Sequence, residues 1–186
     1  MFRKRPPRRP RRPRRPGPRQ AVALRELRRA HRLMDNGQYA QAFPILKRLA
    51  EGAARHGMPI RAAHLFIQAA RARLEMGSAP DAVALAQHTI QLMHDAGKDR
   101  QLRTLLPRMI QALEERGHHQ QAITLRAHME ALLDSQEALQ PQESPPQRRL
   151  PTRCPACNGP VRADQVTWID DRSAECVYCG STLQAE

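Results

Sequence analysis

Four cysteines near the end of the sequence are the strongest candidates for residues that bind a metal ion. They form two Cys-x-x-Cys pairs, Cys154 with Cys157 and Cys176 with Cys179, separated by eighteen residues. A Cys-x-x-Cys segment turns tightly enough for both thiolates to face one ion, and two such segments complete the tetrahedral shell of a structural zinc site. We therefore predict one structural Zn²⁺ bound by these four residues, with no coordination position left for water or substrate.

The segment around the cysteines resembles a zinc ribbon over essentially all of residues 153–186. Asn158 and Gly180 directly follow the two pairs, and both residue types tolerate the left-handed backbone that such a turn often needs. Residues 161–169 alternate moderately between apolar and polar side chains, as the strands of a hairpin do. The resemblance implies a small β-structure organised around the metal.

Two other chemistries use the same residue types. Rubredoxin-like iron has the same four-cysteine ligand set, so the spacing leaves iron open as an alternative. A single Cys-x-x-Cys pair can also be a redox dithiol, but a thioredoxin-like dithiol requires a βαβ setting. Nothing around Cys154 predicts such a setting, and zinc remains our prediction.

The histidines have simpler interpretations. His118 and His119 follow Gly117 at a predicted helix start, where we expect them to be solvated. His88 and His94 do not have the i, i+4 spacing that would place them side by side on a helix. We therefore expect no second metal site.

Trp168 is the only tryptophan, and we expect it to cover the metal core; the alternative is an exposed surface on which nucleic-acid bases stack. Asp170 and Asp171 are expected at the turn of the ribbon hairpin, where adjacent carboxylates point apart and cannot act as an acid/base pair. The sequence contains no phosphate-binding glycine loop, no Gly-x-Ser-x-Gly and no His-Glu-x-x-His motif. We expect that the protein is not an enzyme.

A long segment rich in alanine, leucine and glutamine, residues 21–139, has the apolar spacing of helices and repeats every 40 residues. Gly37, Gly77 and Gly117 each fit the end of one helix, with a second helix starting just beyond. Small or apolar residues five positions after and seven positions before each glycine recur with the same period: Ala42, Ala82, Ala122, Ala30, Ala70 and Ile110. The repeat predicts paired helices that pack closely.

The fold class that follows is mostly α, with three stacked antiparallel helical hairpins and a small β zinc ribbon. We expect helices at about 20–36, 38–56, 58–76, 79–96, 98–116 and 118–139. Pro44 and Pro107 fall inside two of them, where each should kink or restart the helix. Residues 37–42, Gly-Gln-Tyr-Ala-Gln-Ala, resemble the Gly-x-Tyr-x-x-Ala turn of tetratricopeptide repeats, although the period is 40 rather than about 34. The resemblance implies an extended surface for binding a partner.

Charge is distributed unevenly along the 186 residues. The formal net charge is +13, and residues 1–20 alone contain ten basic and no acidic residues. Three successive Arg-Arg-Pro triplets in this segment predict a disordered tail with polyproline II character. Residues 140–152 are rich in proline and glutamine and predict a linker. The expected order is thus the tail (1–20), a helical domain (21–139), the linker (140–152) and the ribbon (153–186).

These features favour an interaction protein. Our first hypothesis is an adaptor that binds a protein partner through its helical hairpins and makes a second contact through the ribbon. The alternative is a protein bound to RNA or DNA through residues 1–20, with help from the ribbon. An anionic membrane surface would also attract the tail, but Phe2 is its only apolar anchor. Because no signal segment or membrane-spanning run is evident, we expect a cytoplasmic protein.

Overall fold

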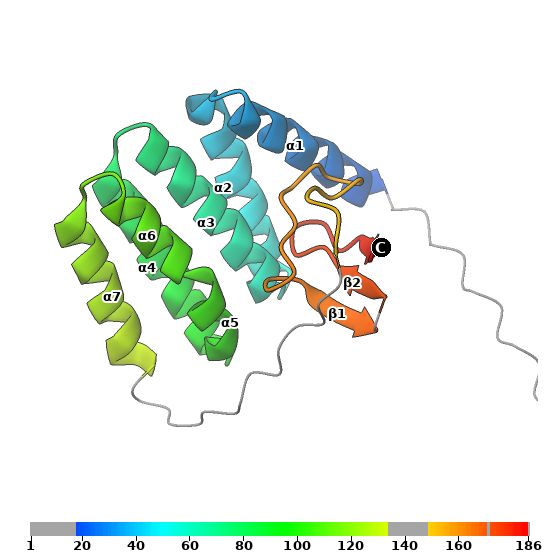
Figure 1. The fold of residues 1–186 in the computed structure, drawn as a ribbon. Helices are drawn as coiled ribbons and strands as arrows, with labels where there is room; N and C mark the ends of the chain where they lie inside the picture. Colours follow the sequence, from blue (N-terminus) through cyan, green and yellow to red (C-terminus); the bar gives the residue numbers. More distant parts are fainter. Residues whose placement is uncertain (1–17, 134–148, 171, 186) are drawn as a thin grey trace, which may run out of the picture.

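The computed structural model describes residues 18–133, 149–170 and 172–185. Most of the predicted tail (1–20) and most of the predicted linker (140–152) lie outside these ranges. At the end of the tail the prediction of disorder is wrong, because residues 18–20 form the start of a helix. The helical part contains α1 (Pro18–Asp35), α2 (Tyr39–Arg55), α3 (Pro59–Glu75), α4 (Ala79–Asp95), α5 (Asp99–Leu105), α6 (Pro107–Glu114) and α7 (His119–Leu133). Figure 1 shows these helices packed in a stack, so the predicted mostly α fold class is confirmed.

The turns between the helices repeat every 20 residues, half of the period that the sequence suggested. Gly37, Gly57, Gly77, Gly97 and Gly117 all adopt positive φ angles, between 63° and 80°. At each turn the glycine N–H and the following N–H bond back to carbonyls in the last helical turn; for example, Gly57 bonds to Ala54 and Met58 to Ala53, both at 3.0 Å. This is the Schellman motif, which requires a left-handed residue at the glycine position. The same Schellman motif therefore ends five helices.

The two prolines inside predicted helices have different effects. Pro107 divides the expected helix 98–116 into α5 and α6, and it occupies the first position of α6, where its missing N–H costs nothing. Pro44 lies within α2, which continues through it. Both Pro44 and Ala40, whose carbonyl loses its helical partner, are exposed, so water can satisfy that carbonyl. The expectation of a helix restart is thus confirmed at Pro107 only.

Small residues at the repeated positions lie at the centre of the stack. Ala30, Ala42, Ala70 and Ala82 have no exposed surface, which allows neighbouring helix backbones to approach closely. The buried side chains form two clusters, one between α3 and α7 and the other between α1 and α3. The second cluster also includes side chains of the C-terminal segment, so the helices and that segment share a core.

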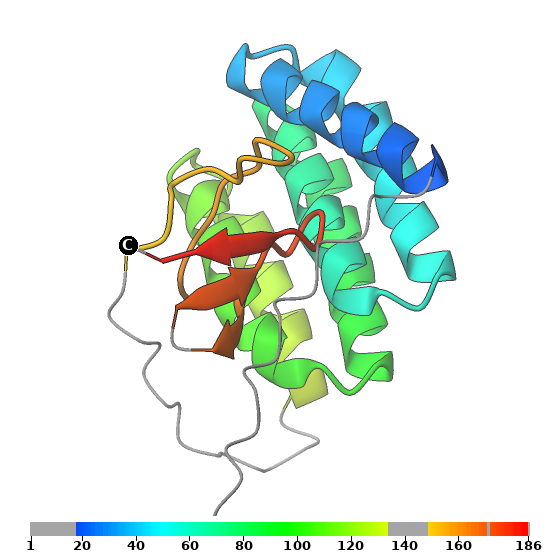
Figure 2. The same ribbon diagram turned by 90° about the vertical axis from the view of Figure 1, so that its right-hand side faces the viewer.

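The C-terminal segment contains a three-stranded antiparallel sheet of strands β1 (Thr167–Asp170), β2 (Ser173–Glu175) and β3 (Thr182–Gln184), in the order β1-β2-β3. Trp168 pairs with Ala174, and Ala174 with Leu183. Figure 2 shows this sheet lying against the side of the helical stack. The hairpin between β1 and β2 turns after Asp170, where the sequence predicted it. The strand signal at 161–166 is wrong, because that stretch forms turns and irregular loop.

No helix in the described ranges is long and apolar enough to cross a membrane.

Candidate metal centre

The four predicted ligands come together in one place. The Sγ atoms of Cys154, Cys157, Cys176 and Cys179 all lie within 4.8 Å of one another. Cys154 and Cys179 are 3.7 Å apart at sulfur, and Cys157 and Cys176 are 3.9 Å apart. A tetrahedron with metal–sulfur bonds of about 2.3 Å has edges of about 3.8 Å. The site therefore has the size and the donor set to hold a metal ion such as zinc.

The two Cys-x-x-Cys turns have the same backbone geometry. The N–H of Asn158 bonds to the carbonyl of Cys154, and the N–H of Gly180 bonds to that of Cys176, both at 2.8 Å. Asn158 and Gly180 have φ angles of 61° and 73°, as their residue types predicted. Asn158 is the only non-glycine with positive φ in the part of the chain that the structure describes. This shared turn directs each pair of thiols inward.

The thiols affect one another's ionisation because they share a small, largely buried volume. Hydrogen bonds from Cys157 and Cys176 lower the pKa of Cys154 to about 6. The pKa of Cys157 is raised, first by its hydrogen bond to Cys154 and further by the other thiols and by burial. Hydrogen bonds from the other thiols, first from Cys154, also lower the pKa of Cys179, whereas the pKa of Cys176 is raised. Cys154 and Cys179 therefore ionise more readily than the other two cysteines, whose protons leave when a cation binds.

Tyr178, rather than Trp168, covers the metal core. Trp168 is half-buried, its indole N–H donates to the carbonyl of Ala163 at 3.3 Å, and it is not among the described side chains packed in the core. Tyr178 stands between the second pair of cysteines, is 4% exposed, and packs in the cluster with three of them. The expectation for Trp168 is therefore wrong. An aromatic residue inside a Cys-x-x-Cys turn was the signal that pointed to the correct side chain.

The helices surround Tyr178 with polar groups. The Gln68 amide on α3 donates a hydrogen bond to the Tyr178 hydroxyl at 2.9 Å. The rings of His31 on α1 and His64 on α3 meet the tyrosine edge-on, with centroids 5.1 and 5.8 Å away. Burial raises the pKa of Tyr178 to about 12. The tyrosine is therefore a neutral anchor that holds the metal-site turn against two helices.

Both histidines are held in the neutral state. His31 is 2% exposed, and its Nδ1 lies 3.0 Å from the carbonyl of Cys157, so Nδ1 carries the proton and donates it to that carbonyl. Burial lowers the pKa of His31, and it lowers the pKa of His64 to about 4. Neutral imidazoles avoid placing a positive charge in the low-dielectric space beside the metal site.

Charged side chains join the ribbon to the helices around this buried contact. Arg153 forms two hydrogen bonds with the Asp35 carboxylate, at 2.8 and 2.9 Å. Arg108 on α6 pairs with Asp164 at 2.7 Å, and Arg61 on α3 pairs with Glu175 at 3.6 Å. The Arg28 side chain on α1 donates to the carbonyl of Ala156. Exposed ion pairs contribute little singly, but these contacts fix the orientation of the ribbon.

Close packing also fixes that orientation. A Cβ atom added at Gly159 would lie 2.6 Å from His31 Cε1 and 2.8 Å from Tyr178 Cδ2. Such distances are far inside van der Waals contact, so the ribbon backbone approaches α1 as closely as its atoms allow.

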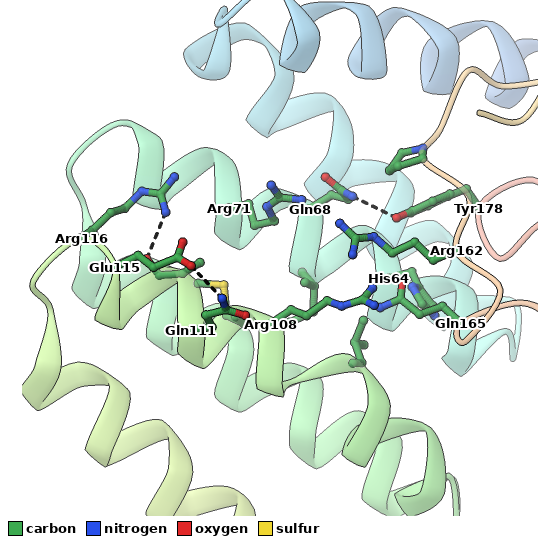
Figure 3. Close-up of a pocket in the computed structure, with 15 residues that line it drawn as sticks. His64, Gln68, Arg71, Arg108, Gln111, Glu115, Arg116, Arg162, Gln165 and Tyr178 are labelled. Atoms are coloured by element: carbon green, nitrogen blue, oxygen red, sulfur yellow. Dashed lines mark hydrogen bonds between the residues drawn. The ribbon is translucent and has the colours of Figure 1, made fainter. Parts of the chain in front are cut away.

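An arginine-lined cavity of about 280 Å³ lies beside the metal centre, between α3, α6 and the ribbon (Figure 3). Its charged lining residues are Arg71, Arg108, Glu115, Arg116 and Arg162. A second cavity shares Arg71 and Arg162 with it and extends to the end of α1. We call the two together the arginine groove. The sequence did not reveal it, because its side chains come from segments about 90 residues apart.

The other histidines do not gather into a site. His118 is half-buried and His119 exposed at the start of α7. His88 packs its ring edge-on against Phe66, with centroids 4.9 Å apart, and His94 lies 3.0 Å from the Asp99 carboxylate. Among the described residues, the four cysteines form the one group with the arrangement of a metal site.

No protein-family model, curated protein or solved structure matches the chain. Membership of the tetratricopeptide family therefore stays a prediction. The fold and the site themselves define the class of protein: a mostly helical stack with a docked C-terminal segment whose four clustered cysteines could hold a metal ion.

Proposed function

We propose that the protein is a non-enzymatic, zinc-binding interaction protein whose partner is nucleic acid. The observation that carries the proposal is the exposed face of α1. Arg25, Arg28, Arg29 and Arg32 have the i, i+3, i+4, i+7 spacing that places them on one side of a helix, and all four are exposed. This face follows directly in the sequence from the ten basic residues of segment 1–20.

The arginines of this face are available for an anionic partner. Arg28 uses one N–H for the Ala156 carbonyl of the ribbon. The side chains of Arg25, Arg29 and Arg32 have no hydrogen-bond or ion-pair partner within the described ranges. Unpaired guanidinium groups along a helix, continued by a basic tail, suit the regular negative charge of a phosphate backbone.

The adaptor hypothesis has less support from the surface. An adaptor would be expected to have an apolar groove on its hairpins for a protein partner. The cavities beside the ribbon are instead lined mainly by arginine and other polar side chains. The exposed large apolar residues within the described ranges are Val22, Met76, Ile123 and Ile169, and they lie apart in the chain, on α1, in the turn after α3, on α7 and on β1. Apolar residues scattered singly do not form a protein-docking patch.

Zinc has a structural role in this proposal. Four thiolates fill a tetrahedral shell, and structural zinc sites of this kind contribute folding energy. The metal would hold Tyr178 and the ribbon against α1 and α3, which keeps the ribbon surface in one place. Iron is the alternative for the same ligand set, and elemental analysis of the purified protein distinguishes the two.

The test is the salt dependence of binding to a labelled mixed-sequence duplex. If most of the ten tail charges engage phosphates, the log–log slope of affinity against salt should be roughly −5 to −9. Deleting residues 1–17 should remove most of this affinity. Replacing Arg25 and Arg29 by alanine should then reduce the slope further by roughly 2.

The matched control for that double variant is Arg100→Ala with Arg103→Ala on α5, which removes the same charge from another helix. Both control arginines are exposed. If the two double variants weaken binding equally, net charge rather than the α1 face is responsible. If the intact protein does not bind nucleic acid at low salt, the proposal is wrong and the adaptor hypothesis becomes the better one.

A further inference from the structure

The arginine groove holds basic side chains from three separate elements around one cavity. Arg71 comes from α3, Arg108 from α6, and Arg162 from the loop that follows the first cysteine pair. Figure 3 shows the three side chains extending toward the same space. We propose that this groove binds the sugar–phosphate backbone of a single-stranded nucleic acid, an inference that rests on the proposed function.

Two of these arginines are free to bind a ligand. Arg71 and Arg162 line both cavities, are exposed, and have no side-chain ion pair within the described residues. Arg108 pairs with Asp164 through one terminal nitrogen, Nη2, while the other, Nη1, is buried without a hydrogen-bond partner. A guanidinium group can bind a phosphate through two parallel N–H donors. The groove therefore offers unused donors of the geometry that a phosphate accepts.

The acidic residues along the groove are mostly neutralised. Asp35 is paired with Arg153, and Glu75 with Arg116. Glu115 accepts a hydrogen bond from Gln111 at 2.7 Å and has no ion pair within the described part of the chain. It lines only the cavity between α3, α6 and the ribbon. The region shared by the two cavities, around Arg71 and Arg162, is thus positively charged.

The shape of the groove favours a single strand over a duplex. A cavity of about 280 Å³ between helices and ribbon is at the lower end of the size of small-ligand pockets. A nucleotide or an extended strand can enter it, whereas a duplex is too wide and would remain on the outer surface. Gln165, which also lines the cavity, and Tyr39, which lines the second cavity and is half-buried, add an amide and an aromatic face for sugars and bases.

An acidic peptide is the competing ligand, because carboxylates also bind arginine. Peptide grooves obtain much of their specificity from apolar pockets for side chains. The residues around Arg71 and Arg162 are instead mostly polar, among them Gln68, Gln165 and Tyr178. The lining therefore favours a polymer whose recognition depends on its backbone.

The experiment compares two double variants of the full chain for binding to a labelled single strand and to the matching duplex. Arg71→Ala with Arg162→Ala alters the groove; Arg100→Ala with Arg103→Ala is the control, since those residues are exposed on α5 and line neither cavity. The groove variant should lose roughly tenfold in single-strand affinity and about 1.4 in salt slope, from two lost phosphate contacts. Its duplex affinity should stay at the value of the control.

The outcomes separate this inference from the proposed function. If the intact chain binds duplex but the groove variant and the control lose single-strand affinity equally, the groove inference is overturned and the proposed function stands. If poly-glutamate displaces the strand and also depends on Arg71 and Arg162, the groove is an acidic-peptide site. If the intact chain binds neither nucleic acid at low salt, both proposals fail. Circular dichroism of each variant checks that loss of binding is not loss of fold.

Discussion

The hydrogen bond between Gln68 and Tyr178 offers a direct test of how strongly the ribbon is joined to the helices. The residues are 7% and 4% exposed, and the Gln68 amide donates to the Tyr178 hydroxyl at 2.9 Å. Tyr178→Phe removes only the hydroxyl and leaves the amide buried without a partner. Such an orphaned group costs about 1–3 kcal/mol, so we expect the free energy of unfolding to fall by that amount.

The second half of the test removes the other partner as well. Gln68→Leu alone leaves the Tyr178 hydroxyl without its donor and should cost a similar amount. In the double variant two apolar groups face each other, and the loss should be smaller than the sum of the single losses by at least about 1 kcal/mol. This coupling measures the contact between the helices and the ribbon in isolation from other effects.

The assay follows urea unfolding of the zinc-loaded protein with two probes. Trp168 is the only tryptophan and lies in β1, so its fluorescence reports on the ribbon, while circular dichroism reports on the helices. Because Tyr178 is buried in a cluster with helical side chains, the two transitions should coincide and shift together. Tyr39→Phe is the matched control, since the Tyr39 hydroxyl has no hydrogen bond within the described residues. Its effect should be within about 0.5 kcal/mol.

Two results would refute the reasoning. Additive losses in the double variant, within about 0.5 kcal/mol, would mean that the two side chains are not coupled. A fluorescence transition that shifts while the circular dichroism transition stays in place would mean that the ribbon unfolds independently of the helices.

Further predictions concern pH, glycines and the metal. Burial lowers the pKa of His64 to about 4 in the folded protein, so below about pH 6.5 the unfolded chain binds a proton that the folded chain does not. Between pH 6.5 and 4 the free energy of unfolding of the wild type should therefore fall by up to about 1.4 kcal/mol per pH unit relative to His64→Phe. Equal pH slopes of the two proteins in urea titrations would contradict this prediction. A Cβ added at Gly57 or Gly52 would meet no other atom, so only backbone conformation distinguishes the two positions. Gly57→Ala, at φ +68°, should lower the free energy of unfolding by about 1 kcal/mol, whereas Gly52→Ala, inside α2, should raise it by a similar amount. Melting temperatures that shift in the same direction in both variants would disprove this explanation. Cys157→Ser should abolish the binding of one zinc per chain, measured by elemental analysis. The same variant should have a lower melting temperature but keep much of its helical circular dichroism, because α3 to α7 have their own core.

Part of the fold follows from local sequence, and for a local reason. The two Cys-x-x-Cys turns and the helix-ending glycines depend on backbone geometry within about five residues. Asn158, Gly180 and Gly37 adopt the left-handed conformation that their residue types predicted. Residue type alone was sufficient at these positions, because few residues tolerate positive φ.

The glycines follow a shorter repeat than the alanines around them. Gly57 and Gly97 adopt the same conformation as Gly37, which halves the apparent period to 20 residues. The alanines around the glycines repeat only every 40 residues, which favours the longer period when the sequence is considered alone. Pro107 and Pro44 show the limit of a local rule, since similar sequence contexts gave a helix break at one and a continuous helix at the other.

The long-range contacts were decided only by the tertiary structure. Tyr178 covers the metal core although Trp168 is the larger aromatic residue, because burial depends on which helices pack against the ribbon. The arginine groove likewise unites Arg71 and Arg162, which are far apart in the chain, and it exists only where the ribbon is docked on α3. Residue spacing determines which atoms can meet within one turn, whereas the packing of whole elements determines which distant side chains share a site.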